Sequence, residues 1–189
     1  MLNTFVVYVE NKPGVLARVS TLFRRRAYNI DSLTVGRTEK PEVSRMTIVV
    51  DADHDQALRI EATLYKLVNV LFVENITNEP AILRDLAMIK VAVTQEARTQ
   101  VFKLAEVFNA RVEDVAPESV TIEITGAEDK IDRLLEVLRP YGVLEMVRTG
   151  VVAVRRGSKS SAVGTASATA TSANGSAPGV PNEDVSYSV

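Results

Sequence analysis

The first 78 residues alternate between two hydrophobic periods, and each change of period predicts a change between strand and helix. Residues 4–9 read Thr-Phe-Val-Val-Tyr-Val, a run of β-branched and aromatic residues that is typical of a strand. After Gly14, apolar residues recur at the spacing of one helix face. They are Val15, Leu16, Val19, Leu22 and Phe23. The segment 11–16 is therefore predicted to turn a first strand into a first helix.

Four more elements complete this unit. Residues 28–35 and 46–50 are predicted to form two strands, separated by the charged, proline-containing loop 37–42. A second helix face follows, consisting of Ala57, Ile60, Leu64 and Leu67. Residues 70–73 then have the apolar character of a last strand. The resulting order, β-α-β-β-α-β, is the split βαβ arrangement of ferredoxin-like folds.

The same order recurs in the second half of the chain. A strand over 85–93 and a hairpin over 111–125 flank a helix. The apolar face of that helix is Val101, Leu104, Ala105 and Phe108. A further helix has Ile131, Leu134, Leu135 and Leu138 on one face. One long final strand is predicted over 143–154, with a bulge at Gly150. The sequence thus predicts an α+β protein of two tandem ferredoxin-like (βαββαβ) units.

The composition changes after Gly157. Residues 158–179 are mostly Ser, Ala, Thr and Gly and contain almost no bulky apolar side chain. Such a segment cannot bury enough surface to offset the entropy lost on ordering. We therefore predict three parts: a first domain over 1–78, a second over 79–157, and a disordered C-terminal tail over 158–189.

The overall composition restricts the classes of function. Apolar residues make up 46% of the 189 residues and charged residues 24%, which is typical of a soluble globular protein. The net charge of −2 argues against nucleic acid as a partner, and residues 46–49 lack the exposed aromatics of an RNA-recognition strand. No apolar run approaches the ~20 residues of a membrane span, and no secretory leader precedes the first strand. A cytoplasmic protein without membrane or nucleic-acid partners is expected.

Side chains suited to catalysis are scarce. The absence of cysteine excludes thiol nucleophiles and thiolate metal sites. The single histidine, His54, lies between Asp53 and Asp55 at a predicted helix start, where a solvated side chain is expected and further metal ligands are lacking. Neither G-x-G-x-x-G nor G-x-x-x-x-G-K-[ST] is present. The sequence therefore predicts binding or regulation, with no catalytic residue, cofactor or metal in this chain.

The turn over residues 11–16 is the strongest binding candidate. Pro13 has no N–H group, and Gly14 lets backbone or ligand approach closely. The first turn of a helix leaves N–H groups unpaired at the positive end of the helix dipole, where a small carboxylate can bind. The alternative, that Asn11 and Gly14 only form a tight turn, stays open on these residues alone.

Several motifs together resemble those of a known family. The segment Glu10-Asn11-Lys12-Pro13-Gly14-Val15-Leu16 resembles the ligand turn of ACT domains, which are amino-acid-sensing ferredoxin-like modules. The segments 28–35, 44–48 and 148–157 make the resemblance to one family more specific. With them, residues 1–157 resemble the small regulatory subunits of acetolactate synthase, also called acetohydroxyacid synthase. The first domain would then be the ACT domain.

The resemblance implies a partner and an effector. In this family a separate large catalytic subunit binds thiamine diphosphate, a divalent metal and FAD. It condenses pyruvate with a second 2-oxo acid in the synthesis of valine, leucine and isoleucine. The small subunit raises this activity and confers feedback inhibition by valine, which binds at the interface of a homodimer of ACT domains. The alternatives are a free-standing ACT-type sensor with another partner, and an enzyme with an unrecognised site.

The resemblance also implies where valine binds, because Asn11, Gly14 and Asn29 match the ligand residues of the family. The valine carboxylate would meet N–H groups of the turn, and its ammonium group would meet the side-chain carbonyls of both asparagines. Leu16, Ile30 and Val35 are candidates for the apolar wall. The expected valine site is Asn11, Gly14, Val15, Leu16, Asn29 and Ile30.

Overall fold

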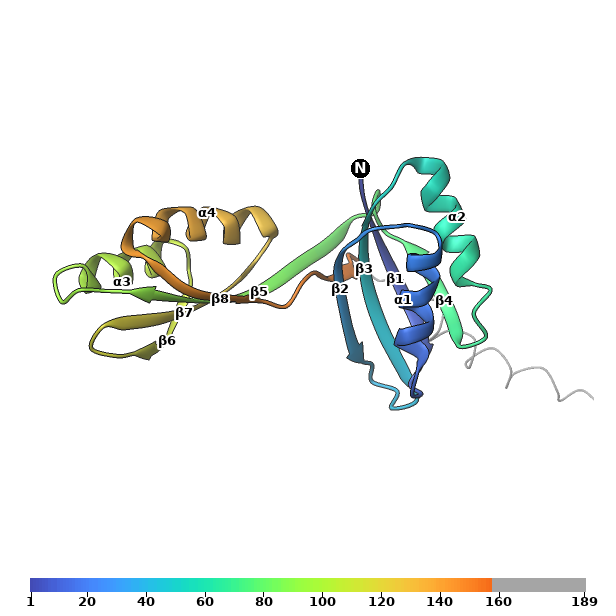
Figure 1. Ribbon diagram of the computed structural model, residues 1–189, viewed down its shortest axis with the longest axis horizontal. Coiled ribbons are helices and arrows are strands. Elements are labelled where there is room, and N and C mark those ends of the chain that lie inside the picture. The colour runs from blue at the N-terminus through green and yellow to red at the C-terminus, as the bar shows by residue number, and fades with distance from the viewer. Residues whose placement is uncertain (158–189) are drawn as a thin grey trace, which may run out of the picture. The chain divides into compact units, whose positions relative to one another are not determined.

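The computed structural model of the protein describes residues 1–157. The predicted disordered tail, residues 158–189, lies outside the described residues. Within the described part, the chain forms two antiparallel sheets, and each sheet has two helices packed on one of its faces (Figure 1). The sequence-based prediction of two ferredoxin-like units is confirmed.

The first unit has the predicted order of elements. They are β1 Leu2–Glu10, α1 Val15–Arg25, β2 Ile30–Arg37, β3 Val43–Asp51, α2 His54–Leu64 and β4 Val70–Asn75. The strands lie in the order β2-β3-β1-β4 and all neighbours are antiparallel. Strand β1 is therefore central and β2 lies at an edge, which leaves one side of β2 without a strand partner among residues 1–157.

Every second residue of β1 contributes a side chain to the first core. Phe5, Val7 and Val9 are at most 1% exposed and face the two helices. Helix α1 adds the predicted Val19 and Phe23, both buried, so the 3.6-residue period of the sequence is matched in the structure. Helix α2 starts at a capping box in which the Asp53 carboxylate accepts a hydrogen bond from the Gln56 N–H at 2.8 Å.

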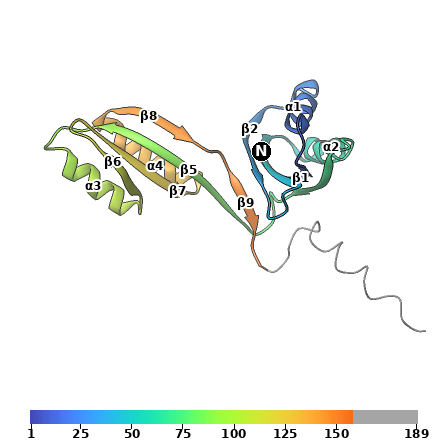
Figure 2. The same cartoon turned by 90° about the horizontal axis from the view of Figure 1, so that it is seen from below.

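The second unit repeats the order and adds one strand. Its elements are β5 Ala81–Ala92, α3 Arg98–Val107, β6 Arg111–Val115, β7 Ser119–Gly126, α4 Glu128–Leu138, the 3₁₀ turn η1 Arg139–Tyr141, β8 Val143–Arg148 and β9 Val152–Arg155. The path β6-β7-β5-β8 matches the strand order of the first unit. Strand β9 pairs with the beginning of β5, beside which it runs in Figure 2.

The prediction of one final strand over 143–154 is wrong. Strand β8 pairs with the second part of β5 and ends at Arg148, whereas β9 starts at Val152 and pairs with residues 81–84. Between them Gly150 adopts φ 87°, a left-handed conformation that glycine tolerates best. The predicted bulge residue is therefore the point at which the strand breaks. Strand β5 also begins at Ala81, four residues before the predicted start.

Strand β9 contacts the face of the first sheet that carries no helix. Ala153 is fully buried and packs with Val6 and Ile76. Val6 points away from the helices because its neighbours Phe5 and Val7 face them. Strand β9 is thus hydrogen-bonded to β5, while its Ala153 side chain packs against the first sheet.

Truncating Leu134 is expected to destabilise the second unit. Leu134 is fully buried in α4 within the second core, and removing such a side chain typically costs about 2–5 kcal/mol through lost transfer energy and a residual cavity. Urea unfolding of Leu134→Ala measures this loss. Val107→Ala is the control, because Val107 is 80% exposed on α3, and equal effects of the two substitutions would contradict the assigned core.

Candidate functional site

The turn between β1 and α1 leaves N–H groups free at a helix N-terminus. Gly14 precedes α1 with φ 82° and ψ −6°, and no side chain caps the helix. The Val15 N–H lies 3.4 Å from the Lys12 carbonyl oxygen, so it is only weakly engaged. Within residues 1–157 the N–H groups of Gly14 and Leu16 have no hydrogen-bond partner. This geometry suits a small carboxylate.

The side chains of the turn differ in their access to a ligand. The Val15 side chain is only 4% exposed and belongs to the core, so Val15 can offer backbone atoms alone. Leu16 is 42% exposed beside it. Space next to Gly14 is open, since a β-carbon built there would have no heavy atom within 4 Å. The turn therefore presents backbone donors and one apolar side chain to solvent.

Asn11 is held in place by its neighbours in the β2–β3 loop. Its backbone N–H donates to the Glu42 carbonyl at 2.7 Å, and its side-chain Nδ2 donates to the Pro41 carbonyl at 2.8 Å. These bonds leave the side-chain Oδ1 without a partner in the described part of the chain. Asn11 can therefore offer the acceptor that was expected for a ligand ammonium group.

Glu10 adds a negative charge that the sequence reasoning missed. The Asn69 side-chain amide donates to its carboxylate at 2.5 Å, and Lys12 Nζ lies 3.1 Å from the same Oε2 oxygen. These two hydrogen bonds, that from Asn69 first, lower the pKa of Glu10 from its usual value. A carboxylate thus lies one residue before Asn11, where its negative charge favours a cation over an anion.

The two predicted asparagines lie at opposite ends of the first sheet. The last residue of β1, next to Asn11, pairs with Val43, whereas Ile30 pairs with Val50. Seven residues of β3 separate these positions, which corresponds to about 23 Å at a rise of ~3.3 Å per residue. Asn29 is exposed and Ile30 is half-buried against the first core. One chain alone does not bring the predicted site residues together.

His54 lies on the surface at the start of α2. Its side chain is exposed there, as expected. No group of three or more histidine, aspartate or glutamate side chains in residues 1–157 is arranged to hold a metal ion. None of the helices in this part of the chain is long and apolar enough to cross a membrane.

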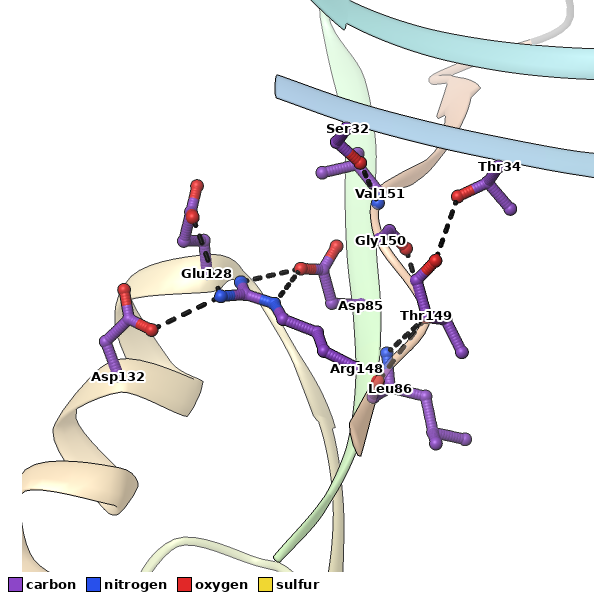
Figure 3. A network of polar contacts seen from close by, with 10 residues as sticks. All are labelled: Ser32, Thr34, Asp85, Leu86, Glu128, Asp132, Arg148, Thr149, Gly150 and Val151. Carbon is purple, nitrogen blue, oxygen red and sulfur yellow. Dashed lines mark hydrogen bonds and ion pairs between the residues drawn. The ribbon is translucent and has the colours of Figure 1, made fainter. Parts of the chain in front are cut away.

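A polar network surrounds the break between β8 and β9 (Figure 3). Arg148 Nε donates a hydrogen bond to Asp85 Oδ2 at 2.6 Å, and Nη2 forms an ion pair with the same oxygen, also at 2.6 Å. Its Nη1 lies 3.3 Å from Asp132 and 3.6 Å from Glu128, both in the first turns of α4. Asp85 is only 3% exposed, so the guanidinium group supplies its counter-charge. The sequence reasoning noted the segment 148–157 but not this network.

The fold and the matching family models define the class of the protein. A model described as an AHAS small subunit-like ACT domain matches residues 5–72, which include the turn, β2 and β3. A model described as the small subunit of acetolactate synthase matches residues 84–157. The first unit is therefore an ACT domain joined to the C-terminal domain found in such subunits.

Comparison with whole proteins gives the family. The chain is 47% identical to a probable acetolactate synthase small subunit from Archaeoglobus fulgidus, over 84% of this chain and 99% of that protein. It is also 47% identical to the acetolactate synthase small subunit from Mycolicibacterium smegmatis, over 82% and 91% of the two chains. The crystal structure of the Thermotoga maritima small subunit superposes with a TM-score of 0.79 and 38% identity, covering 84% of this chain and 99% of that one. The chain belongs to the acetolactate synthase small-subunit family.

Proposed function

We propose that this chain activates a catalytic large subunit of acetolactate synthase and makes it sensitive to inhibition by valine. One observation of the structure carries the effector part of this proposal. Free N–H groups of Gly14 and Leu16 and the free side-chain oxygen of Asn11 belong to the same turn, residues 11–16. These groups complement the carboxylate and the ammonium group of an amino acid. The family relationship supports the large subunit as the partner.

A homodimer would complete the site. Strand β2 has one free edge within the described residues and exposes Val35 on it, so a second copy can add its own β2 there. Antiparallel pairing of the two β2 strands by a twofold axis would place Asn29 of one copy at the end of the sheet where Asn11 of the other lies. The separation of the two asparagines in one chain supports this arrangement.

The apolar residues near such a site suit a branched side chain. Leu16 and Val35 are 42% and 41% exposed, and burying them against an isopropyl group would remove apolar surface from water. One methylene group discriminates by only about 1–3 kcal/mol. We therefore expect leucine and isoleucine to compete with valine, with lower affinity.

Reconstitution tests this proposal. The full chain is mixed with the large subunit of the same organism, and acetolactate formation is measured with and without valine. We expect this chain to raise the rate of acetolactate formation, and we expect valine to remove this increase. Valine binding without any effect on the large subunit would instead indicate a free-standing sensor. Turnover of pyruvate by this chain alone would indicate an enzyme.

Asn29→Ala is expected to weaken valine binding selectively. A lost hydrogen bond to a charged ammonium group costs about 1.5–3 kcal/mol, or ~10–150-fold in affinity. Calorimetry with valine measures this loss, and co-sedimentation with the large subunit should stay unchanged. Asn78→Ala is the control, because Asn78 is also exposed but lies in the linker before β5. Unchanged valine affinity in Asn29→Ala would make Asn29 a turn residue only.

A further inference from the structure

Strand β2 of the ACT domain is bonded directly to the break between β8 and β9. The Val151 N–H donates to Ser32 Oγ at 2.9 Å, and Thr34 Oγ1 donates to the Thr149 carbonyl at a longer 3.5 Å (Figure 3). Ser32 and Thr34 are two residues apart, so both point to the same face of β2. This is the face without helices, because their partners on β3 are Val49 and Thr47, whereas Ile48 lies in the first core.

Gly150 fits between these two side chains because it has no β-carbon. A β-carbon on Gly150 would lie 2.7 Å from Ser32 Oγ and 3.2 Å from Thr34 Oγ1. Its φ of 87° would strain any other residue as well. The break between β8 and β9 can therefore approach β2 this closely only because residue 150 is glycine.

The other end of the segment 148–151 is anchored in the second unit. Arg148 is bonded to buried Asp85 and to Asp132 in α4. The Thr149 N–H donates to the Leu86 carbonyl at 3.0 Å, and Thr149 Oγ1 accepts from the Leu86 N–H at 3.1 Å. The segment 148–151 thus bonds to β2 through Thr149 and Val151, and to β5 and α4 through Arg148 and Thr149.

The start of β2 is the part of the ACT domain expected to respond to an effector. Asn29 and Ile30 belong to the proposed valine site, and the pairing of β2 with β3 is irregular between Ile30 and Ser32. An irregularity of this kind leaves a residue unpaired and interrupts the ladder locally, so the start of β2 is paired less regularly than the rest of the strand. The hydroxyl group that holds Val151 is therefore only two residues from the proposed ligand contact.

We propose that residues 148–151 form a coupling segment through which valine binding at the start of β2 acts on the C-terminal domain. The inference rests on the proposed function, because it takes valine as the effector. A shift of β2 would move Ser32 Oγ, which accepts the hydrogen bond from Val151, and would change the space around Gly150. The segment passes this change to α4 through Arg148, since the ion pairs to Asp132 and Glu128 join it to the first turns of that helix.

Gly150→Ala is expected to separate valine binding from valine inhibition. The added methyl group displaces the segment from Ser32 but touches none of the proposed ligand residues. Calorimetry with the full chain should give an unchanged affinity for valine. In the reconstituted enzyme, the valine concentration for half-inhibition should rise about tenfold or more, within the ~5–150-fold range of typical allosteric couplings. Normal inhibition, or lost valine binding, in this variant would overturn the proposal.

Two further variants control for misfolding and for nonspecific effects. Gly157→Ala adds the same methyl group at a glycine with a similar φ of 84°, where nothing lies within 4 Å, and should be inhibited like the unmodified chain. Ser32→Ala removes the acceptor of Val151 without adding an atom, and should weaken inhibition in the same direction as Gly150→Ala. Unaltered inhibition of Ser32→Ala would contradict a role of the Ser32–Val151 bond.

Hydrogen exchange distinguishes failure of this inference from failure of the proposed function. If the unmodified chain binds no valine, the proposed function is wrong. The coupling segment is then tested without valine: Gly150→Ala should raise amide exchange both in β2 and in the first turns of α4. A rise confined to one of these elements, or to neither, would show that the segment does not connect them.

Discussion

Gly14→Asp is expected to abolish the response to valine while the fold is retained. Gly14 lies at the free N–H groups where the ligand carboxylate is proposed to bind. Two like charges about 4 Å apart repel by ~4 kcal/mol at an effective dielectric constant of ~20, which corresponds to about a thousandfold loss of affinity. The fold should tolerate the change, because the space is open and aspartate accepts φ values near 82° better than most residues.

Gly14→Asn is the matched control for this prediction. Asparagine has nearly the same shape as aspartate and the same tolerance of the left-handed region, but no charge. Valine inhibition of the reconstituted enzyme and thermal unfolding are measured for both variants. We expect similar melting temperatures and a smaller loss of inhibition in Gly14→Asn. Near-normal inhibition of Gly14→Asp would show that no carboxylate binds at this helix start.

Valine is expected to strengthen the homodimer by a large factor. If each site takes Asn11 from one copy and Asn29 from the other, only the dimer contains complete sites. Twofold symmetry then gives two sites per dimer. At a valine concentration ~100 times its dissociation constant, each site contributes a factor of about 100, so the dimer dissociation constant should fall by about 10⁴.

Sedimentation velocity at dilute protein, with and without saturating valine, measures this shift. Asn11→Ala serves as the control, because it removes a proposed ligand contact without touching the free edge of β2. Without valine, this variant should have the same dimer dissociation constant as the unmodified chain. Saturating valine should lower that constant less than it does in the unmodified chain. A dimer dissociation constant that does not move with valine in the unmodified chain would rule out a shared interfacial site.

Much of the fold was predictable because its elements follow simple hydrophobic periods. The β-branched and aromatic run over residues 4–9 and the helix spacing from Val15 to Phe23 reappear as β1 and α1. Both βαββαβ orders were predicted in the same way, and the exposure of His54 followed from its acidic neighbours. The turn before α1 was also predictable from sequence, because a proline and a glycine before an apolar helix face mark a helix start. Ligand binding at this turn stays a prediction.

The tertiary structure alone decided the relations between distant segments. The spacing of hydrophobic residues does not specify which part of β5 a C-terminal strand pairs with. The break at Gly150 and the separate strand β9 could therefore not be predicted. Likewise, the pairing register placed Asn11 and Asn29 at opposite ends of the sheet. The contacts of Ser32 with Val151 and of Arg148 with Asp85 span 119 and 63 residues. Such contacts depend on how the strands are ordered and paired, which local patterns of polarity do not specify.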